Sequence, residues 1–388
     1  MKRIILLLLL LVFSINVKAE EKPEELYAQS AVLMDADTGR VLFEKDGNSV
    51  KAMASTTKIM TCIISLEEME EDDIVTFSKY ASSQPKVHLG AKEGESFYMK
   101  DMLYSLMLES YNDVAVAIAE AISGSVESFA MKMNQKAMEI GCENTYFITP
   151  NGLDAQDEKG FHSTTARDLA KIMSYCVKDS PRKEAFLEIT AKPSHTFSNL
   201  ENTRQYSCQN HNSYLNMKEE AISGKTGYTG KAGYCYVGAV ESEGRTFVVS
   251  LLASGWPNNK NYKWRDMNKI VDYALTEYER KDIAQEITLK EVCVNHGITE
   301  ALFQTKKIKA DLKNSDEKIL LGKEEELEVH VQQIGEIEAP VEKGEQLGSV
   351  LYTLHGEKIA EYPIVSTETV KRIDFFWIFS KIMELYLL

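Results

Sequence analysis

Hydrophobic positions form short runs near residues 30–45 and take up a helical period soon afterwards. Two short apolar stretches, 31–34 and 41–43, flank the turn residues Asp37-Thr38-Gly39 and predict an N-terminal β-hairpin. From about 99 to 144, apolar residues recur at three- and four-residue intervals, which is typical of helices. The first half of the chain therefore predicts a hairpin followed by a mainly helical region.

Strand patterns return in the second half of the chain. Stretches 234–240 and 246–252 flank the turn Ser242-Glu243-Gly244, and a helical pattern follows over 262–278. Strands at both ends with helices between them predict one mixed sheet, assembled from the two extremities of an α/β domain with an inserted helical region.

The pattern changes again from about 287. Short alternating stretches at 319–321, 327–331 and 350–354 are separated by charged turns and glycines. They predict a small all-β domain. Because the sequence there is poor in reactive residue types, we expect it to serve as a spacer or docking module.

The final stretch, 371–388, has the pattern of an amphipathic helix. Its apolar face consists of Phe375, Phe379, Ile382 and Tyr386, and its polar face of Asp374, Ser380, Lys381 and Glu384. Aromatic anchors and a preceding Lys-Arg pair favour a helix that lies in a membrane interface. The alternative is a terminal helix that packs on its own β domain.

The N-terminus has the pattern of a secretory signal. Lys2-Arg3 precede an unbroken apolar run over 4–13, and Val17-Lys18-Ala19 offers small residues before Glu20. The run is too short to span a bilayer comfortably. We therefore expect an exported protein in four parts: a signal peptide at 1–19, an α/β domain at 20–282, an all-β domain at 283–366 and an amphipathic helix at 367–388.

Composition narrows the possible functions. The chain has 388 residues, 44% of them apolar, which is enough for two domains with sizeable cores. Its formal charge of −15 argues against electrostatic binding of nucleic acid. The six cysteines show no zinc-ligand spacing, and both buried thiols and disulfides are compatible with their positions.

Candidate chemistry begins at Ser55, which opens a predicted helix and has Lys58 one turn later. A serine hydroxyl is a weak nucleophile, and an unprotonated amine within reach is one way to activate it. The simpler interpretation is a serine that caps the helix. The same Ser-x-x-Lys spacing occurs at 83–86, 180–183 and 315–318, so the pair alone does not decide between the two.

Two further motifs follow in order. Ser110-Tyr111-Asn112 lies where two helical stretches meet and is compatible with a simple helix break. Gly224-Lys225-Thr226-Gly227 precedes the strand at Tyr234. A phosphate-binding loop would require glycine in place of Glu219, so the nucleotide-binding interpretation fails.

Ser-x-x-Lys, Ser-x-Asn and Lys-Thr-Gly in this order are typical of penicillin-binding proteins and class A β-lactamases. With these motifs the chain resembles the D-alanyl-D-alanine carboxypeptidases, low-molecular-mass penicillin-binding proteins of the S11 serine peptidase type. Supporting matches are the segments 34–42, 151–154, 165–170 and 231–234. The resemblance covers nearly the whole chain after the signal peptide. It implies a fold like that of penicillin-binding proteins and β-lactamases.

The resemblance also implies a reaction and a site. The substrate would be the D-Ala-D-Ala end of a peptidoglycan stem pentapeptide, β-lactams would inhibit the enzyme, and no metal or organic cofactor would be needed. Ser55, Lys58 and Ser110 would be catalytic, with Ser55 the nucleophile and Lys58 its base. The resemblance further implies a substrate-binding set: Asn112, Lys225, Thr226, Gly227 and Tyr228. The enzyme would act in cell-wall synthesis at the outer face of the cytoplasmic membrane.

The chain departs from the family pattern at two positions. Tyr111 takes the place of a residue that is often small, and Tyr228 that of a histidine common after Lys-Thr-Gly. Either departure could alter substrate access or β-lactam affinity. His211 lies near an arginine of some relatives and is left out of the predicted site. We expect the other histidines, such as His88, His162 and His195, to be surface or loop residues.

Two other functions compete with this prediction. A β-lactamase would need a deacylating glutamate, for which Glu158 is the candidate, although the motif expected around it is missing. A non-catalytic cell-wall binding or β-lactam-sensing protein would capture ligand without turnover, against which the intact Lys58, Ser110 and Lys225 count.

Overall fold

The computed structural model describes residues 22–283, 287–313 and 318–386. The predicted signal peptide lies outside these residues. The chain separates into two compact units, the first ending at Glu277 and the second beginning at Tyr278.

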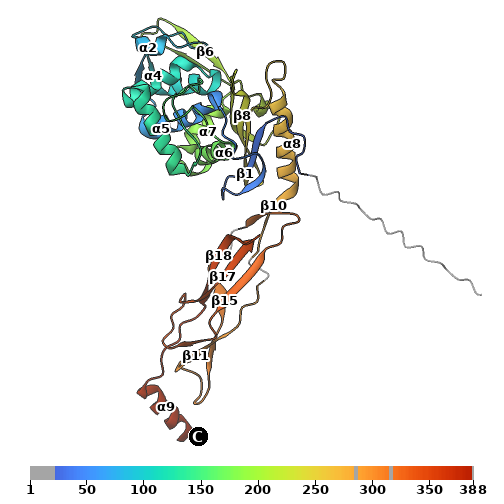
Figure 1. Cartoon of the computed structure of the whole chain (residues 1–388). Helices are drawn as coiled ribbons and strands as arrows, with labels where there is room; N and C mark the ends of the chain where they lie inside the picture. Colours follow the sequence, from blue (N-terminus) through green and yellow to red (C-terminus); the bar gives the residue numbers. More distant parts are fainter. Residues whose placement is uncertain (1–21, 284–286, 314–317, 387–388) are drawn as a thin grey trace, which may run out of the picture. The chain divides into compact units, whose positions relative to one another are not determined.

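A five-stranded sheet forms the centre of the first unit (Figure 1). Its strands stand in the order β2-β1-β9-β8-β7, so the N-terminal hairpin joins strands from near residue 250. The bounds are β1 Ser30–Asp35, β2 Val41–Lys45, β7 Ala221–Thr229, β8 Gly233–Ser242 and β9 Arg245–Leu252. The predicted sheet, built from distant parts of the chain, is therefore confirmed.

One feature of the predicted sheet is wrong. Every pairing in this sheet is antiparallel rather than mixed in direction. The reason is that short turns join β1 to β2, β7 to β8 and β8 to β9, and a short turn can connect only antiparallel neighbours.

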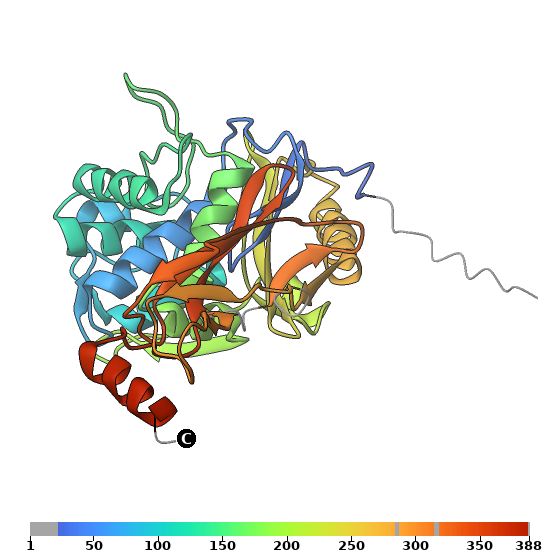
Figure 2. The same ribbon diagram turned by 90° about the horizontal axis from the view of Figure 1, so that it is seen from below.

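Helices cover both faces of the sheet. Helix α8 (Tyr262–Glu277) lies against β8 and β9 on one face, and α6 (Ala166–Ser174) lies against β1, β8 and β9 on the other. Figures 1 and 2 both show the remaining helices of this unit beyond α6. Both faces of the central strands are consequently buried, and β9 has no exposed residue.

The inserted helical region contains the Ser-x-x-Lys and Ser-x-Asn motifs. Its elements are α1 (Lys58–Glu68), β3 (Ile74–Thr76), α2 (Lys79–Ser82), β4 (Ser96–Tyr98), α3 (Met99–Tyr104), η2 (Ser105–Glu109), α4 (Asn112–Ser123), α5 (Val126–Ile140), η3 (Tyr175–Asp179) and α7 (Lys183–Ala191). The helical stretch predicted over 99–144 is thus interrupted twice. The interruption at Ser110 matters most, because it separates the π-helical turn η2 from α4 and places the Ser-x-Asn motif at the break.

Two hairpins near this region were not predicted: β3 with β4, and β5 (Ser194–Ser198) with β6 (Gln205–Gln209). Their strands are three to five residues long, so the alternating pattern has little length in which to appear.

The second unit contains mainly β-structure, as predicted. It has a four-stranded sheet in the order β13-β18-β17-β15, a three-stranded sheet β12-β11-β16 and the pair β10-β14. The strands are β10 Tyr278–Lys281, β11 Val292–Asn295, β12 Lys306–Ile308, β13 Ala310–Leu312, β14 Ile319–Gly322, β15 Glu328–Gln333, β16 Glu336–Glu338, β17 Gln346–Leu354 and β18 Glu357–Ser366. Helix α9 (Phe375–Tyr386) follows, and none of its described residues is buried.

All six cysteines lie among the described residues, and each has a free thiol. Four of them are buried, which agrees with the buried-thiol alternative. Within the described chain no single helix is long and apolar enough to cross a membrane, although α4 and α5 meet that criterion together as a pair bent by 84°.

Candidate active site

Ser55 lies in a 3₁₀ turn, η1 (Ala54–Thr57), that leads directly into α1. The capping role considered for Ser55 is wrong, because neither η1 nor α1 begins with a side-chain capping hydrogen bond. Ala54 has a φ of +49°, a left-handed conformation that costs a non-glycine residue free energy. The residue immediately before Ser55 is therefore strained, which is frequent at functional sites.

Lys58 is completely buried, with its amine at the centre of a polar cluster. Its Nζ lies 3.0 Å from the Ser55 Oγ, 2.9 Å from the Asn112 Oδ1 and 2.8 Å from the main-chain oxygen of Asn151. Residues from three distant segments thus meet at a single nitrogen.

Burial also lowers the pKa of Lys58 well below that of a free lysine, and the positive charge of Lys225 lowers it further. The carboxylate of Asp113 opposes the shift. Because Lys58 is also the first residue of α1, the partial positive charge of the helix N-terminus disfavours the ammonium form too. Lys58 is therefore suited to accept a proton near neutral pH.

Ser110 and Asn112 stand on either side of the helix break. Ser110 has a φ of +65°, and Asn112 begins α4. The main-chain N–H of Asn112 donates to the Val87 oxygen at 2.8 Å, and its Nδ2 donates to the Pro85 oxygen at 3.3 Å. These two bonds hold the amide of Asn112 with its oxygen toward Lys58.

The Lys-Thr-Gly motif lies on β7, the edge strand of the sheet, which lies against η1. The buried amine of Lys225 is 2.9 Å from the Ser110 Oγ, and burial lowers its pKa to about 7. A Cβ on Gly227 would lie only 2.9 Å from the Ser55 nitrogen. Glycine at this position therefore lets the strand approach the N-terminus of α1.

A cleft of about 570 Å³ opens over these groups. Seven of its lining residues belong to the segments described above: Ser55, Ser110, Asn112, Gly152, Thr226, Gly227 and Tyr228. The ring of Tyr228 lies tilted by 37° against that of Tyr234, with ring centroids 4.7 Å apart, and both residues line the cleft. The structure thus brings the eight residues predicted from the motifs to one cleft or its buried wall.

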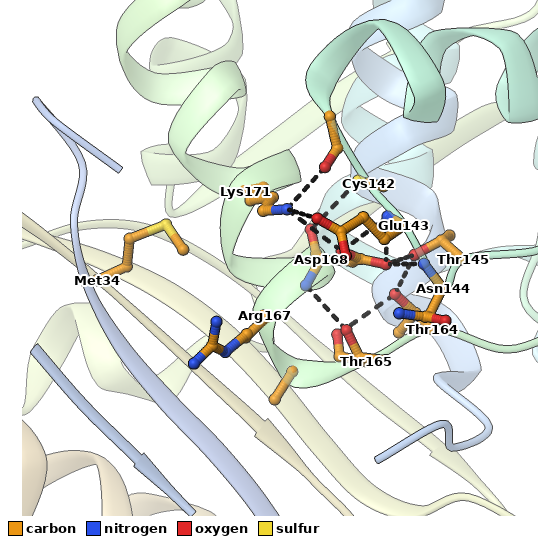
Figure 3. A network of polar contacts seen from close by, with 12 residues as sticks. Met34, Cys142, Glu143, Asn144, Thr145, Thr164, Thr165, Arg167, Asp168 and Lys171 are labelled. Carbon is orange, nitrogen blue, oxygen red and sulfur yellow. Dashed lines mark hydrogen bonds and ion pairs between the residues drawn. The ribbon is translucent and has the colours of Figure 1, made fainter. Parts of the chain in front are cut away.

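Asp168 holds the start of the loop that leads to Asn151, and Figure 3 shows its contacts with residues 143–145. The carboxylate of Asp168 accepts hydrogen bonds from the main-chain nitrogens of Glu143 and Asn144 and from the Thr145 hydroxyl. Thr145 also contacts Thr164 at 2.7 Å. Both ends of the loop that runs from 145 to 164 are thereby fastened to the start of α6.

Three parts of this site were not predicted from the sequence. The main-chain oxygen of Asn151 contacts Lys58, Gly152 packs against Ala54, and His211 lines the cleft, with its Nε2 2.8 Å from the Glu109 carboxylate. The Asn-Gly-Leu-Asp segment was noted only as a family match, although it was the available signal for the first two. Among the described residues, no group of three His, Cys, Asp or Glu side chains is arranged to hold a metal ion.

The expectation of a surface or loop histidine holds for the loop position of His162, but the side chain is only 3% exposed and lies beside Thr57. The loop that carries His162 folds inward beneath η1, the turn that contains Ser55. His195 is also partly buried, with its Nε2 2.7 Å from Asp101.

Sequence comparisons place the chain among proteins with one recurring activity. The profile of the family described as D-alanyl-D-alanine carboxypeptidase matches residues 16–254, and that of the penicillin-binding protein 5 C-terminal domain matches residues 303–372. The chain is 31% identical to the D-alanyl-D-alanine carboxypeptidase DacF of Bacillus subtilis, over 92% of this chain and 89% of that protein.

Solved structures show the same similarity. Penicillin-binding protein 5 of Haemophilus influenzae matches with a TM-score of 0.67 and 25% identity, over 90% of this chain and 99% of that chain. Penicillin-binding protein D2 of Listeria monocytogenes, in its cefotaxime-bound form, matches with a TM-score of 0.57 and 25% identity, over 65% of this chain and 99% of that chain.

Proposed function

This chain belongs to the D-alanyl-D-alanine carboxypeptidase family, and from that premise we propose that Ser55 is the nucleophile that removes the terminal D-alanine from peptidoglycan stem peptides. The chain is a serine-type D-alanyl-D-alanine carboxypeptidase of peptidoglycan metabolism. The observation that carries the residue assignment is the 3.0 Å contact between the Lys58 amine and the Ser55 hydroxyl in a buried cluster.

In the proposed acylation step, the Ser55 Oγ attacks the carbonyl carbon between the two D-alanines, and its proton passes to the Lys58 Nζ. A neutral amine has two hydrogens, and the oxygens of Asn112 and Asn151 can accept both. The lone pair of the nitrogen is then left for the serine proton. This arrangement supports Lys58 as the general base.

The remaining roles follow from the family resemblance and agree with the contacts. The main-chain N–H groups of Ser55 and Tyr228 would stabilise the oxyanion. When the C–N bond breaks, the leaving D-alanine nitrogen would receive a proton through Ser110, which is in contact with Lys225. Water would then hydrolyse the ester on Ser55, with Lys58 again accepting a proton.

The cleft is suited to an anionic substrate. None of the described residues that line the cleft carries a carboxylate. The lining does include four basic residues: Lys86, His211, Lys260 and Lys263. The protein as a whole carries a formal charge of −15, so this local excess of basic groups stands out. We propose that Lys225, Thr226 and Gly227 bind the terminal carboxylate of the substrate and Asn112 its acyl side.

The β-lactamase alternative receives little support from the structure. Glu158 is exposed and is not among the residues that line the cleft. Benzylpenicillin is therefore expected to form a slowly hydrolysed ester rather than to be turned over rapidly.

Release of free D-alanine tests the proposed activity. The purified protein is incubated with a peptide that ends in D-Ala-D-Ala and, as a control, with one that ends in D-Ala-L-Ala. We expect free D-alanine from the first peptide, no free alanine of either configuration from the second, and none from the first with Ser55→Ala. A protein that binds penicillin but releases no D-alanine would instead be a sensor of the kind considered above.

We also propose that the protein is exported and lies at the outer face of the cytoplasmic membrane. In this proposal, residues 1–19 are a signal peptide, 20–282 the catalytic domain, 283–366 a spacer domain and 367–388 a membrane-interface helix. The exposed aromatic residues of α9, including Phe375 and Phe379, support the last part. Co-sedimentation with vesicles of anionic phospholipid should be lost with Phe375→Ser/Phe379→Ser, and retained with the polar-face control Ser380→Ala.

A further inference from the structure

His162 lies beneath the active site and has no role in the reaction described above. Its side chain is buried, and both of its ring nitrogens have polar partners. Nδ1 is 3.0 Å from the main-chain nitrogen of Ile148, and Nε2 is 2.8 Å from the hydroxyl of Thr57. The ring therefore joins the loop before Asn151 to the turn that carries the nucleophile.

The contacts determine which nitrogen carries the proton. A main-chain N–H can only donate, so the Nδ1 that faces Ile148 must be an acceptor. The single proton of the neutral ring then lies on Nε2, which donates to the Thr57 Oγ1. Burial lowers the pKa of His162 to about 3, so the ring stays in this neutral form.

The Thr57 hydroxyl links His162 to η1, the turn that contains Ser55. Because it accepts from His162, its own hydrogen is available to the Ala54 main-chain oxygen, 2.8 Å away. Ala54 is the residue with the strained φ of +49° that immediately precedes Ser55. The chain of bonds from His162 through Thr57 thus ends on the peptide group that orients the nucleophile.

The Nδ1 side of the His162 ring holds the segment that contains Asn151, whose main-chain oxygen accepts a hydrogen bond from Lys58. Ile148 begins the short segment that leads to Asn151, whose main-chain oxygen is 2.8 Å from the Lys58 Nζ. Gly152 follows, and a Cβ there would lie 2.0 Å from the Ala54 oxygen, so the two backbones are in direct contact. One imidazole therefore fastens both parts of the site at the point where they meet.

We infer that His162 is a positioning residue for acylation: it holds the Ala54–Ser55 peptide and the Asn151 oxygen in register with Lys58 through one donated and one accepted hydrogen bond. This inference rests on the proposed function of Ser55. A residue that only filled space would stabilise the fold without affecting the rate of a correctly folded site. A displacement of about 1 Å at a catalytic group, by contrast, can lower a rate about a hundredfold.

The test measures the acylation rate of folded sites alone. Full-length variants are labelled with a fluorescent penicillin, the number of sites is titrated at saturating label, and the second-order rate constant is expressed per titrated site. The variants are His162→Phe, which keeps a ring without polar atoms, and His162→Gln, which keeps a donor and an acceptor. Thr57→Val and Thr57→Ser form the matching pair.

We expect His162→Phe and Thr57→Val each to lower the rate per site at least tenfold, and His162→Gln and Thr57→Ser to remain within threefold of the wild type. Since both residues act in one chain of bonds, the double variant His162→Phe/Thr57→Val should be no more than threefold slower than the slower single variant. Thr57→Val alone supplies the test if His162→Phe does not fold.

Wild-type rates per site in both His162→Phe and Thr57→Val, or effects that multiply in the double variant, would overturn the inference. A wild-type protein that takes up no label at all would instead refute the proposed function. The two failures are therefore distinguishable in one experiment.

Discussion

The amine of Lys58 lies 3.0 Å from the hydroxyl of Ser55, and both groups belong to a single turn of chain at the start of α1. The two residues are neighbours in the sequence, but the environment of the amine is built by distant residues. Burial of the amine depends on Asn112 and Asn151, which come from segments more than 50 residues away. One motif thus supplies the proposed nucleophile and base, and two other segments bury the amine of the base.

Replacing the proposed base should abolish acylation without unfolding the protein. Lys58→Met keeps an unbranched side chain of similar length in the buried site, yet it has no lone pair to accept the Ser55 proton. We expect the rate constant for acylation by benzylpenicillin to fall at least about a thousandfold. The matched control is Lys132→Met, which removes an exposed ion pair with Glu68 near the far end of α1 and should leave the rate unchanged. Acylation of Lys58→Met within tenfold of the wild-type rate would exclude Lys58 as the base.

The pH dependence of kcat/KM for the peptide substrate should be bell-shaped. On the acid side, activity rises as Lys58, whose pKa is lowered by burial and by Lys225, loses its proton. On the alkaline side, activity falls as Lys225 loses its charge, because its pKa is lowered to about 7 and the neutral amine holds a carboxylate poorly. A bound anion should move the alkaline limb of kcat to higher pH. Arginine stays charged, so any residual activity of Lys225→Arg should lack the alkaline limb; an unchanged limb would assign it to another group.

The buried charge of Lys225 should lower the stability of the folded protein, although the proposed reaction needs it. The pKa of Lys225 is lowered by burial, so between about pH 7 and pH 10 the unfolded chain binds more protons than the folded one. The free energy of unfolding of the wild type should therefore rise with pH across this range. Lys225→Met removes the buried charge, and we expect a gain of about 1–3 kcal/mol at pH 6.5.

That gain should shrink towards pH 10, where the lysine is neutral in the folded protein and begins to lose its proton in the unfolded chain. Chemical denaturation of the wild type and Lys225→Met at both pH values measures it. A variant less stable than the wild type at pH 6.5 would show that the hydrogen bond to Ser110 outweighs the cost of burying the charge.

Two glycines with the same backbone conformation separate packing from backbone strain. Gly152 and Gly94 both have a φ of +85°, but a Cβ on Gly152 would lie 2.0 Å from the Ala54 oxygen, whereas one on Gly94 would meet nothing within 4 Å. Gly94→Ala should cost about 1 kcal/mol through the left-handed conformation alone. Gly152→Ala should cost more than about 3 kcal/mol, or lower acylation more than about a hundredfold, because the Ala54 peptide must move. Equal effects of the two substitutions on stability and rate would refute the close approach.

The side chains that converge on the cleft could be selected from the sequence because they lie in short motifs of fixed spacing. The sequence could not predict the Asn151 oxygen, since a main-chain carbonyl has no residue type to reveal it. His162 escaped notice for a related reason: its partners are the Ile148 main chain and Thr57, the latter 105 residues away. Thr57 and His162 therefore show no short sequence spacing that would reveal them as a pair.

Local propensities explain the other differences. The strand β7 was not among the predicted strands, because Gly224 and Gly227 weaken its strand pattern. The structure needs glycine at both positions: a Cβ on Gly224 would collide with the Tyr236 hydroxyl, and one on Gly227 with the start of α1. These are sites where packing and function override the local signal.

The most direct test of the central claim is to locate the covalent adduct. The full-length protein is incubated with benzylpenicillin, digested, and examined by tandem mass spectrometry. If the convergence of the three motifs makes Ser55 the nucleophile, the penicilloyl group will be found on Ser55 and nowhere else. An adduct on Ser110, or an unmodified Ser55 in protein that still releases D-alanine, would contradict the account.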